Sequence, residues 1–307
     1  MKSVIVIAII LLFLSACAAD LKGKEPRPDI EIKGQQCSSI PPGRGLVMDF
    51  IADAPPKSLV KDDRFPVILK FANYNPDPIN IELRVQDDSG TDTFSPQIKN
   101  LYIEGATYEK SRLQYPGCKI DNIPELNLGL FAYTLDANKN IRFIAKAFYD
   151  YTSMLSGSVC AYDVITGASS SCGGKETLTE GSLGPYAPYN PVSVVSIEKN
   201  LLGIEKSQVI MAWDIKIRNM LPNGLVKENL VNFRIDSEEI PINCRSVSSE
   251  SAGSSLDLKL DEKGEASVRC ESELFIDSVE RYNFVIDLDY RYEYFAASQP
   301  IEYRMES

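Results

Sequence analysis

The strongest constraint on the fold is an alternation of apolar and polar residues with a period of two. In residues 282–294, every second position is Tyr, Phe, Ile or Leu, and the positions between are mostly polar. Residues 209–217 alternate in the same way, with the only Trp of the chain, Trp213, in the middle. Successive side chains of a strand point to opposite faces, so these runs predict half-buried strands. Shorter alternating stretches between turn residues predict an all-β sandwich fold.

The chain is long enough for two domains. Its 307 residues fit two units at about 100–200 residues per domain. We expect a first β-sandwich at residues 46–165 and a second at residues 192–307, with an edge strand at residues 301–304. The segment between them, residues 166–191, is rich in Gly, Ser and Pro and predicts a linker. A Pro-rich ligand for a partner is the alternative interpretation of this segment.

The N-terminal residues predict export. A short cationic start, an apolar run and small residues before a cut are typical of a secretory signal peptide, here residues 1–16. Leu14-Ser15-Ala16-Cys17 resembles the lipobox of lipoprotein signal peptides. The resemblance implies cleavage before Cys17 and a diacylglycerol on its thiol, with residues 17–45 as a tether. The alternatives are an ordinary signal peptide with a Cys near its cut, and an uncleaved N-terminal helix as in pilins.

The cysteine count agrees with export. If Cys17 carries lipid, six of the seven Cys remain, and an even number in an exported chain predicts disulfides. Spacing and placement favour two pairs, and the third follows by elimination: Cys160–Cys172, Cys244–Cys270 and Cys37–Cys118. No C-x-x-C pair is present, so zinc ribbons and thioredoxin-like redox motifs are not supported.

Composition excludes several classes of function. The chain has no His, which removes Ser-His-Asp and Cys-His catalysis and all imidazole metal ligands. Its net charge is −11, and from Pro191 onward 13 Lys and Arg stand against 21 Asp and Glu, a net charge of −8. No cluster of Lys and Arg is present, so nucleic-acid binding is disfavoured. We therefore predict no enzyme, no cofactor and no metal site.

A few groups of residues are candidates for a binding, metal or catalytic site. Tyr290, Tyr292 and Tyr294 are a candidate binding surface, although an inward strand face near the domain edge is the favoured interpretation. Residues 136–140 imitate the start of a calcium loop, but Ile141 and Ala147 replace its required Gly and Glu, so a turn is predicted. The carboxylate pairs at 87–88 and 238–239 are adjacent residues, which point to opposite faces of a strand rather than across a cleft.

These observations lead to an expected function. Trp213 resembles the core Trp of immunoglobulin-type sandwiches. With the lipobox at Cys17, the chain resembles the immunoglobulin-like surface lipoproteins of prokaryotic envelopes, archaeal ones among them. The resemblance implies two immunoglobulin-like β-sandwich domains in tandem and transfers no functional residue.

We expect a non-enzymatic binding or scaffolding protein on the extracytoplasmic face of the cell envelope. It would be attached to the membrane by its lipid and would bind a protein partner. The alternatives are a polymerising, pilus-like surface subunit and a carboxylate-based glycan hydrolase.

Overall fold

The computed structural model describes residues 35–36 and 45–305, with gaps at 76, 91–93, 95, 110–116, 121–123, 166–171, 180–181, 184–189, 206, 222–223, 248–251 and 277. Contacts divide the chain into Met1–Lys33 and Gly34–Ser307, and the fold below is that of the second unit. Among the described residues its named elements are strands together with a short 3-10 helix, η5 (Lys227–Asn229), which confirms the predicted all-β fold. No helix of the described residues has the length and apolar character needed to cross a bilayer.

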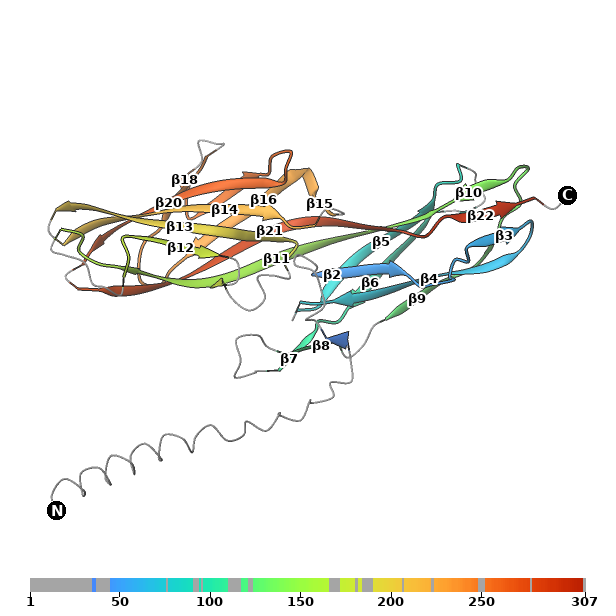
Figure 1. Cartoon of the computed structure of the whole chain (residues 1–307), viewed down its shortest axis with the longest axis horizontal. Helices are drawn as coiled ribbons and strands as arrows, with labels where there is room; N and C mark the ends of the chain where they lie inside the picture. Colours follow the sequence, from blue (N-terminus) through green and yellow to red (C-terminus); the bar gives the residue numbers. More distant parts are fainter. Residues whose placement is uncertain are drawn as a thin grey trace, which may run out of the picture. The chain divides into compact units, whose positions relative to one another are not determined.

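Two long strands form the centre of the fold. β11 (Phe143–Ala161) and β21 (Glu280–Ala297) pair antiparallel over their whole lengths, from Ile144 opposite Ala297 to Ala161 opposite Glu280. Figure 1 shows them side by side through both groups of strands. The sequence predicted β11 as two separate strands, at residues 141–152 and 159–164. The pair therefore takes part in both predicted sandwich regions.

The first group of strands lies around the N-terminal half of β11. β5 (Ile79–Asp87) pairs with residues 143–148 of β11, and β6 (Gln97–Ile103) pairs with β5. A second sheet has the order β2 (Leu46–Phe50), β4 (Arg64–Asn73), β9 (Glu125–Ala132). A small sheet joins three short strands: β1 (Gln35–Gln36), β8 (Gly117–Ile120) and β7 (Thr107–Glu109).

The second group of strands also forms two sheets. On the free edge of β21 lie β16 (Leu230–Asp236), then β19 (Ser255–Lys259), and separately β15 (Gly224–Val226). The other sheet has six strands, in the order β12 (Lys175–Thr179), β13 (Val192–Glu205), β14 (Gln208–Asn219), β20 (Glu265–Phe275), β17 (Asn243–Ser246) and β18 (Ala252–Gly253). β12 lies inside the predicted linker, so part of that segment belongs to a sheet.

The C-terminal strand returns to the first group. β22 (Ile301–Arg304) pairs with β10 (Lys139–Ile141) on one side and with β3 (Ser58–Val60) on the other. It is therefore the middle strand of a three-stranded sheet, and the expectation of an edge strand in the second sandwich is corrected. The buried apolar residues of both groups belong to one contiguous core, and the number of domains stays a prediction.

The core confirms two inferences from the alternating pattern. Trp213 is completely buried, and its ring meets that of Phe284 at 5.0 Å between centroids, edge to face. The inward positions of 282–294 are buried as well. Such aromatic contacts add about 0.5–1.5 kcal/mol beyond the area that they bury.

Two of the predicted disulfides are present. Cys160–Cys172 closes the loop after β11, and Cys244–Cys270 joins β17 to β20. Cys244 and Cys270 lie directly opposite each other in neighbouring strands, so this bond lies within one sheet. The core disulfide of antibody domains instead links two facing sheets. Cys17, Cys37 and the side chain of Cys118 lie outside the described residues, as do the predicted signal peptide and most of the tether, and these assignments stay predictions.

Candidate functional site

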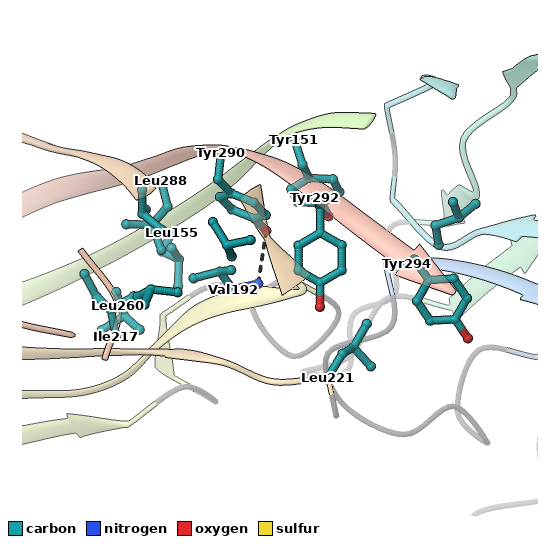
Figure 2. Packing of buried hydrophobic residues seen from close by; sticks show 14 of the residues in the cluster. Tyr151, Leu155, Val192, Ile217, Leu221, Leu260, Leu288, Tyr290, Tyr292 and Tyr294 are labelled. Carbon is teal, nitrogen blue, oxygen red and sulfur yellow. Dashed lines mark hydrogen bonds between the residues drawn. The ribbon is translucent and has the colours of Figure 1, made fainter. Parts of the chain in front are cut away.

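The candidate binding surface of three tyrosines is a part of the core. Tyr290, Tyr292 and Tyr294 are exposed by only 6%, 0% and 7%, which agrees with the favoured interpretation of an inward strand face and corrects the candidate binding surface. Tyr290 and Tyr292 join Tyr149 and Tyr151 of β11 in a tyrosine cluster, with neighbouring ring centroids 5.6–6.2 Å apart. Figure 2 shows Tyr290 and Tyr292 directed into the packed interior. Their rings cover the core between the two groups of strands.

The hydroxyls of Tyr290 and Tyr292 are hydrogen-bonded inside the protein. The Tyr290 hydroxyl accepts from the backbone N–H of Val192 at 3.0 Å (Figure 2). It donates to Ser153 Oγ at 2.8 Å, because the Ser153 hydroxyl itself donates to the Val192 carbonyl. The Tyr292 hydroxyl donates to Asn219 Oδ1 at 2.9 Å. Burial raises the pKa of Tyr290 well above its usual range and raises that of Tyr292 as well. Both phenols are therefore neutral and structural near pH 7.

Tyr149 differs from its neighbours. Its hydroxyl has no hydrogen-bond partner among the described residues, and its side chain is buried. Burial raises the pKa of Tyr149, and the nearby tyrosines raise it further. A buried hydroxyl without a partner costs about 1–3 kcal/mol, so the ring of Tyr149 stabilises the core while its hydroxyl does not.

A pocket lies beside the tyrosine cluster, where β5 leaves β11. The ladder between these strands ends at Phe148, and β11 continues without β5. We call the resulting cavity the junction pocket. It has a volume of about 360 Å³, within the range of small-molecule sites. Its described lining consists of Asn75, Asp77, Pro78, Ile79, Asp150, Tyr151, Thr152, Met154 and Asn190.

Two buried carboxamides are among the residues that line the junction pocket. Asn75 and Asn190 are exposed by 6% and 3%, and the Tyr151 hydroxyl contacts Oδ1 of both, at 3.2 Å for Asn190. The Nδ2 groups of both carboxamides have no partner among the described residues. Polar groups at this depth are normally hydrogen-bonded, and each exception calls for a physical reason. The junction pocket is therefore lined by two Asn residues whose buried Nδ2 groups make no hydrogen bond within the described residues.

A second cavity shares Asp150 with the junction pocket. This outer groove also has a volume of about 360 Å³ and lies on the outward side of the gap between β5 and β11. Its described lining consists of Asn80, Ile81, Glu82, Asn100, Leu101, Tyr102, Phe148, Tyr149, Asp150 and Arg291. The Tyr102 side chain is 61% exposed, and the Arg84 guanidinium lies over the Phe148 ring at 4.9 Å. The groove thus combines an accessible aromatic ring with carboxamides and charges.

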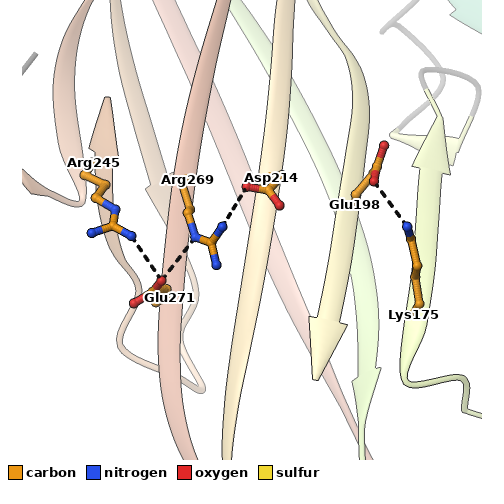
Figure 3. A network of polar contacts seen from close by, with 6 residues as sticks. All are labelled: Lys175, Glu198, Asp214, Arg245, Arg269 and Glu271. Atoms are coloured by element: carbon orange, nitrogen blue, oxygen red, sulfur yellow. Dashed lines mark hydrogen bonds and ion pairs between the residues drawn. The ribbon is translucent and has the colours of Figure 1, made fainter. Parts of the chain in front are cut away.

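The outward face of the six-stranded sheet is a charge-paired surface. Figure 3 shows Arg269 of β20 between Asp214 of β14, at 3.8 Å, and Glu271, at 3.2 Å. Arg245 reaches Glu271 at 3.6 Å, and Lys175 pairs with Glu198 at 3.6 Å (Figure 3). Exposed pairs of this kind contribute about 0–1 kcal/mol each. Because the charges are paired with one another, this face offers no concentrated charge to a ligand.

Lys199 is a buried cation with a structural environment. Its Nζ donates to the carbonyls of Cys160 at 2.7 Å and Gly173 at 2.9 Å, and it pairs with Glu176 at 3.2 Å. Burial lowers the pKa of Lys199, and the carboxylate of Glu176 opposes that change. These contacts fix β13 to the loop that the Cys160–Cys172 disulfide closes. Lys199 therefore lacks the free amine that a catalytic lysine needs.

The remaining sequence candidates have structural partners. Asp87 accepts from the Tyr133 hydroxyl, Asp88 accepts from the backbone N–H of Arg142 at 2.6 Å, and Glu239 accepts from that of Asn283 at 3.0 Å. Residues 136–138 lie in the connection between β9 and β10, as predicted for a turn, and residues 139–140 already belong to β10. Within the described part of the chain, no group of three His, Cys, Asp or Glu side chains is placed to hold a metal ion.

The residues of the junction pocket were missed by sequence reasoning. Asn75 and Asn190 each precede a proline, in Asn75-Pro76 and Asn190-Pro191. The Asn-Pro dipeptide is typical of turns, so the sequence predicts only that both Asn residues lie in segments connecting strands. No local pattern indicates that residues 115 positions apart meet at one hydroxyl. A search of protein-family models and a search of curated proteins found no match for this chain.

Proposed function

We propose that this protein is a lipid-anchored binding or scaffolding protein on the extracytoplasmic face of the cell envelope, without catalytic activity. The N-terminal residues support export and attachment to the membrane, and the junction pocket offers a place where a ligand could bind. The lipid on Cys17 would hold the chain at the membrane, and residues 18–45 would act as a tether.

The observation that carries the proposal is the pair of buried disulfides. Cys160–Cys172 and Cys244–Cys270 are both shielded from solvent within an all-β structure. Disulfides persist in oxidising compartments and are rare in the cytosol, so they support export of this chain. The even number of cysteines left after lipidation of Cys17 agrees with this compartment.

The mass of the mature N-terminus tests the anchor. We expect the protein from membranes to begin at Cys17 and to carry the mass of a diacylglyceryl group. Cys17→Ala is expected to leave the chain unlipidated and to release it from the membrane fraction. A mature chain that keeps residues 1–16 would contradict the anchor and favour the pilus-like alternative.

Site-specific photocrosslinking in whole cells tests binding. A photoreactive residue at Met154, in the junction pocket, is compared with one at Val247, outside the described lining; their side chains are 66% and 73% exposed. We expect a discrete adduct at position 154 and none at position 247. Equal labelling at the two positions would contradict a role for the pocket in binding.

One observation favours a second function, hydrolysis of a glycan. The carboxylates of Asp77 and Asp150 both line the junction pocket, and glycosidases use two carboxyls across a cleft. This candidate predicts cleavage of an oligosaccharide by the purified protein and loss of that activity in Asp150→Asn. The binding proposal predicts no cleavage by either protein.

A further inference from the structure

We propose that one edge of β11, at residues 150–154, binds an extended and basic segment of a protein partner as an additional strand. We call these residues the open edge. The inference rests on the proposed binding function and names the class of partner for the same site. It follows from three properties of the open edge: the direction of its backbone groups, the cavity beside it and the charges around it.

The backbone groups of the open edge point away from β21. In an antiparallel pair, every second residue directs its N–H and C=O groups to the partner strand, and the residues between direct them to the other side. β11 and β21 pair without a register shift from residue 144 to residue 161. The N–H of Ser156 donates to the Leu183 carbonyl at 3.1 Å, so the even-numbered residues of β11 are those that point away from β21. In the open edge these residues are Asp150, Thr152 and Met154.

These backbone groups have no strand beside them in the described part of the chain. β5 pairs with β11 only as far as Phe148, and Leu183 contacts the strand again at Ser156. Between these two points, no described residue forms a backbone hydrogen bond with the three residues on this side. Their side chains are exposed, so the open edge lies at the surface. An edge with unpaired N–H and C=O groups is a template for one more strand, here of about five residues or about 17 Å.

The junction pocket provides space along the open edge. Its lining includes four of the five residues of that edge, and it also includes residues 77–79, where β5 begins. Neighbouring strands lie about 4.8 Å apart, so an added strand needs open space next to the backbone rather than packed side chains. Pro78 and Ile79 give the pocket an apolar part on which a side chain of the added strand can pack. Strand addition uses main-chain hydrogen bonds for affinity and such pockets for alternate side chains.

The charges around the open edge favour a basic segment. Asp77 and Asp150 are the charged residues of the described pocket lining, and both are exposed. Asp289 adds a third carboxylate beside the edge, since it accepts from Thr152 Oγ1 at 2.6 Å. Arg291 lies opposite Asp150 in the ladder and offsets part of this charge. The excess of carboxylates attracts Lys and Arg and repels an acidic segment.

Peptide binding to the full-length protein, in detergent if it is isolated from membranes, tests the inference. The probes are three capped, fluorescently labelled peptides that repeat Lys-Val, Glu-Val or Lys-Pro three times, and fluorescence anisotropy at about 0.15 M salt measures their binding. Proline has no N–H to donate to a ladder, so the Lys-Pro peptide has the charge of the Lys-Val peptide without its ability to add a strand. We expect the Lys-Val peptide to bind with a Kd about tenfold or more below those of the other two.

Hydrogen exchange locates the added strand, and a charge variant tests the carboxylates. The bound Lys-Val peptide should slow exchange of the outward amides of the open edge about tenfold or more, because these N–H groups gain acceptors. Asp150→Asn should raise the Kd of this peptide about threefold. Glu262→Gln, which removes the same charge from an exposed turn outside the described lining, should leave the Kd unchanged.

Several results would overturn the inference. Equal binding of the Lys-Val and Lys-Pro peptides would show attraction by charge alone, and equal binding of the Lys-Val and Glu-Val peptides would remove the preference for a basic segment. No binding of the Lys-Val peptide, or unchanged exchange at the open edge, would reject strand addition there. An unchanged Kd in Asp150→Asn would show that the carboxylates of the edge do not select the partner. An adduct at Met154 in cells together with no binding of the Lys-Val peptide would keep the proposed binding function and reject only the basic strand.

Discussion

The tyrosine cluster and the junction pocket are neighbours on β11, yet their buried polar groups differ in hydrogen bonding. In the cluster, the hydroxyls of Tyr290 and Tyr292 meet Val192, Ser153 and Asn219. In the pocket, the Nδ2 groups of two buried carboxamides have no partner among the described residues. Tyr151 belongs to both regions, since its ring packs on Tyr290 and its hydroxyl contacts the carboxamides.

This difference separates buried groups that hold the fold together from buried groups that do not. A satisfied buried hydrogen bond contributes about 0.5–1.5 kcal/mol, whereas a buried polar group without a partner costs about 1–3 kcal/mol. The hydroxyls of Tyr290 and Tyr292 therefore stabilise the fold. The carbonyls of the two pocket carboxamides serve the Tyr151 hydroxyl. We infer that their Nδ2 groups, which have no partner among the described residues, contribute little to stability.

Alkaline pH should have the largest effect on the tyrosine cluster. The pKa of a tyrosine in the unfolded chain is about 10, and burial raises the pKa values of Tyr149 and Tyr290 in the folded protein. Above about pH 10 the unfolded chain binds fewer protons than the folded one, so stability falls by up to about 1.4 kcal/mol per pH unit for each tyrosine. Urea unfolding at about pH 9 and pH 11 measures this effect. Equal stability at the two pH values would contradict a buried cluster.

Gly224→Ala should have the next largest effect. A Cβ on Gly224 would overlap the Tyr292 hydroxyl and ring, and overpacking of this kind costs about 1–3 kcal/mol. Because part of the overlap is with the hydroxyl, the same substitution should cost less in a Tyr292→Phe background. Urea unfolding of both single variants and the double variant measures this coupling. Strictly additive effects would show that the hydroxyl does not restrict Gly224.

Tyr290→Phe should lower stability by about 1–2 kcal/mol, because it leaves the Val192 N–H without its acceptor and removes the hydrogen bond from Tyr290 to Ser153 Oγ. The ring and its contacts remain, so the loss belongs to the hydroxyl. Thermal and urea unfolding are the measurements. A variant as stable as the parent protein would mean that the cluster is held by packing alone.

Tyr149→Phe is the matched control and should have the smallest effect. Both tyrosines are buried in the same cluster, but the Tyr149 hydroxyl has no partner among the described residues. We expect stability within about 0.5 kcal/mol of the parent protein, or a slight gain. We also expect a smaller loss of stability at alkaline pH. A loss similar to that of Tyr290→Phe would remove the distinction between the two hydroxyls.

The alternating pattern was sufficient for the fold class and the burial of Trp213, because both depend on which face of a strand a residue occupies. The Cys160–Cys172 pair followed instead from spacing, since Cys172 lies between β11 and β12. The continuity of β11 was not predictable in this way. Residues 153–158 contain a Gly and three Ser, which predict a break between strands. The structure explains in a different way why a Gly stands at position 157. A Cβ there would lie 2.6 Å from the Phe284 ring, so a larger residue would collide with it.

The topology and the candidate site depend on contacts between distant residues. β22 pairs with β10 and β3 of the first group, and no local pattern records which strand it pairs with. The short strand β12 has one apolar residue, Leu178, and was therefore assigned to the linker. The junction pocket requires β5 to leave β11 at Phe148, which is a property of the ladder rather than of either strand alone.

The stability of the double variant Asn75→Ala/Asn190→Ala tests the central claim most directly. Because this variant removes both carbonyls that the Tyr151 hydroxyl contacts, it is measured in a Tyr151→Phe background. If the carboxamides hold no further part of the fold together, its free energy of unfolding in urea should lie within about 1 kcal/mol of Tyr151→Phe alone. Tyr290→Phe, measured beside it, should lose more stability relative to the parent protein. A loss of about 2 kcal/mol or more relative to Tyr151→Phe would show that the carboxamides are part of the structural core, and it would contradict the account.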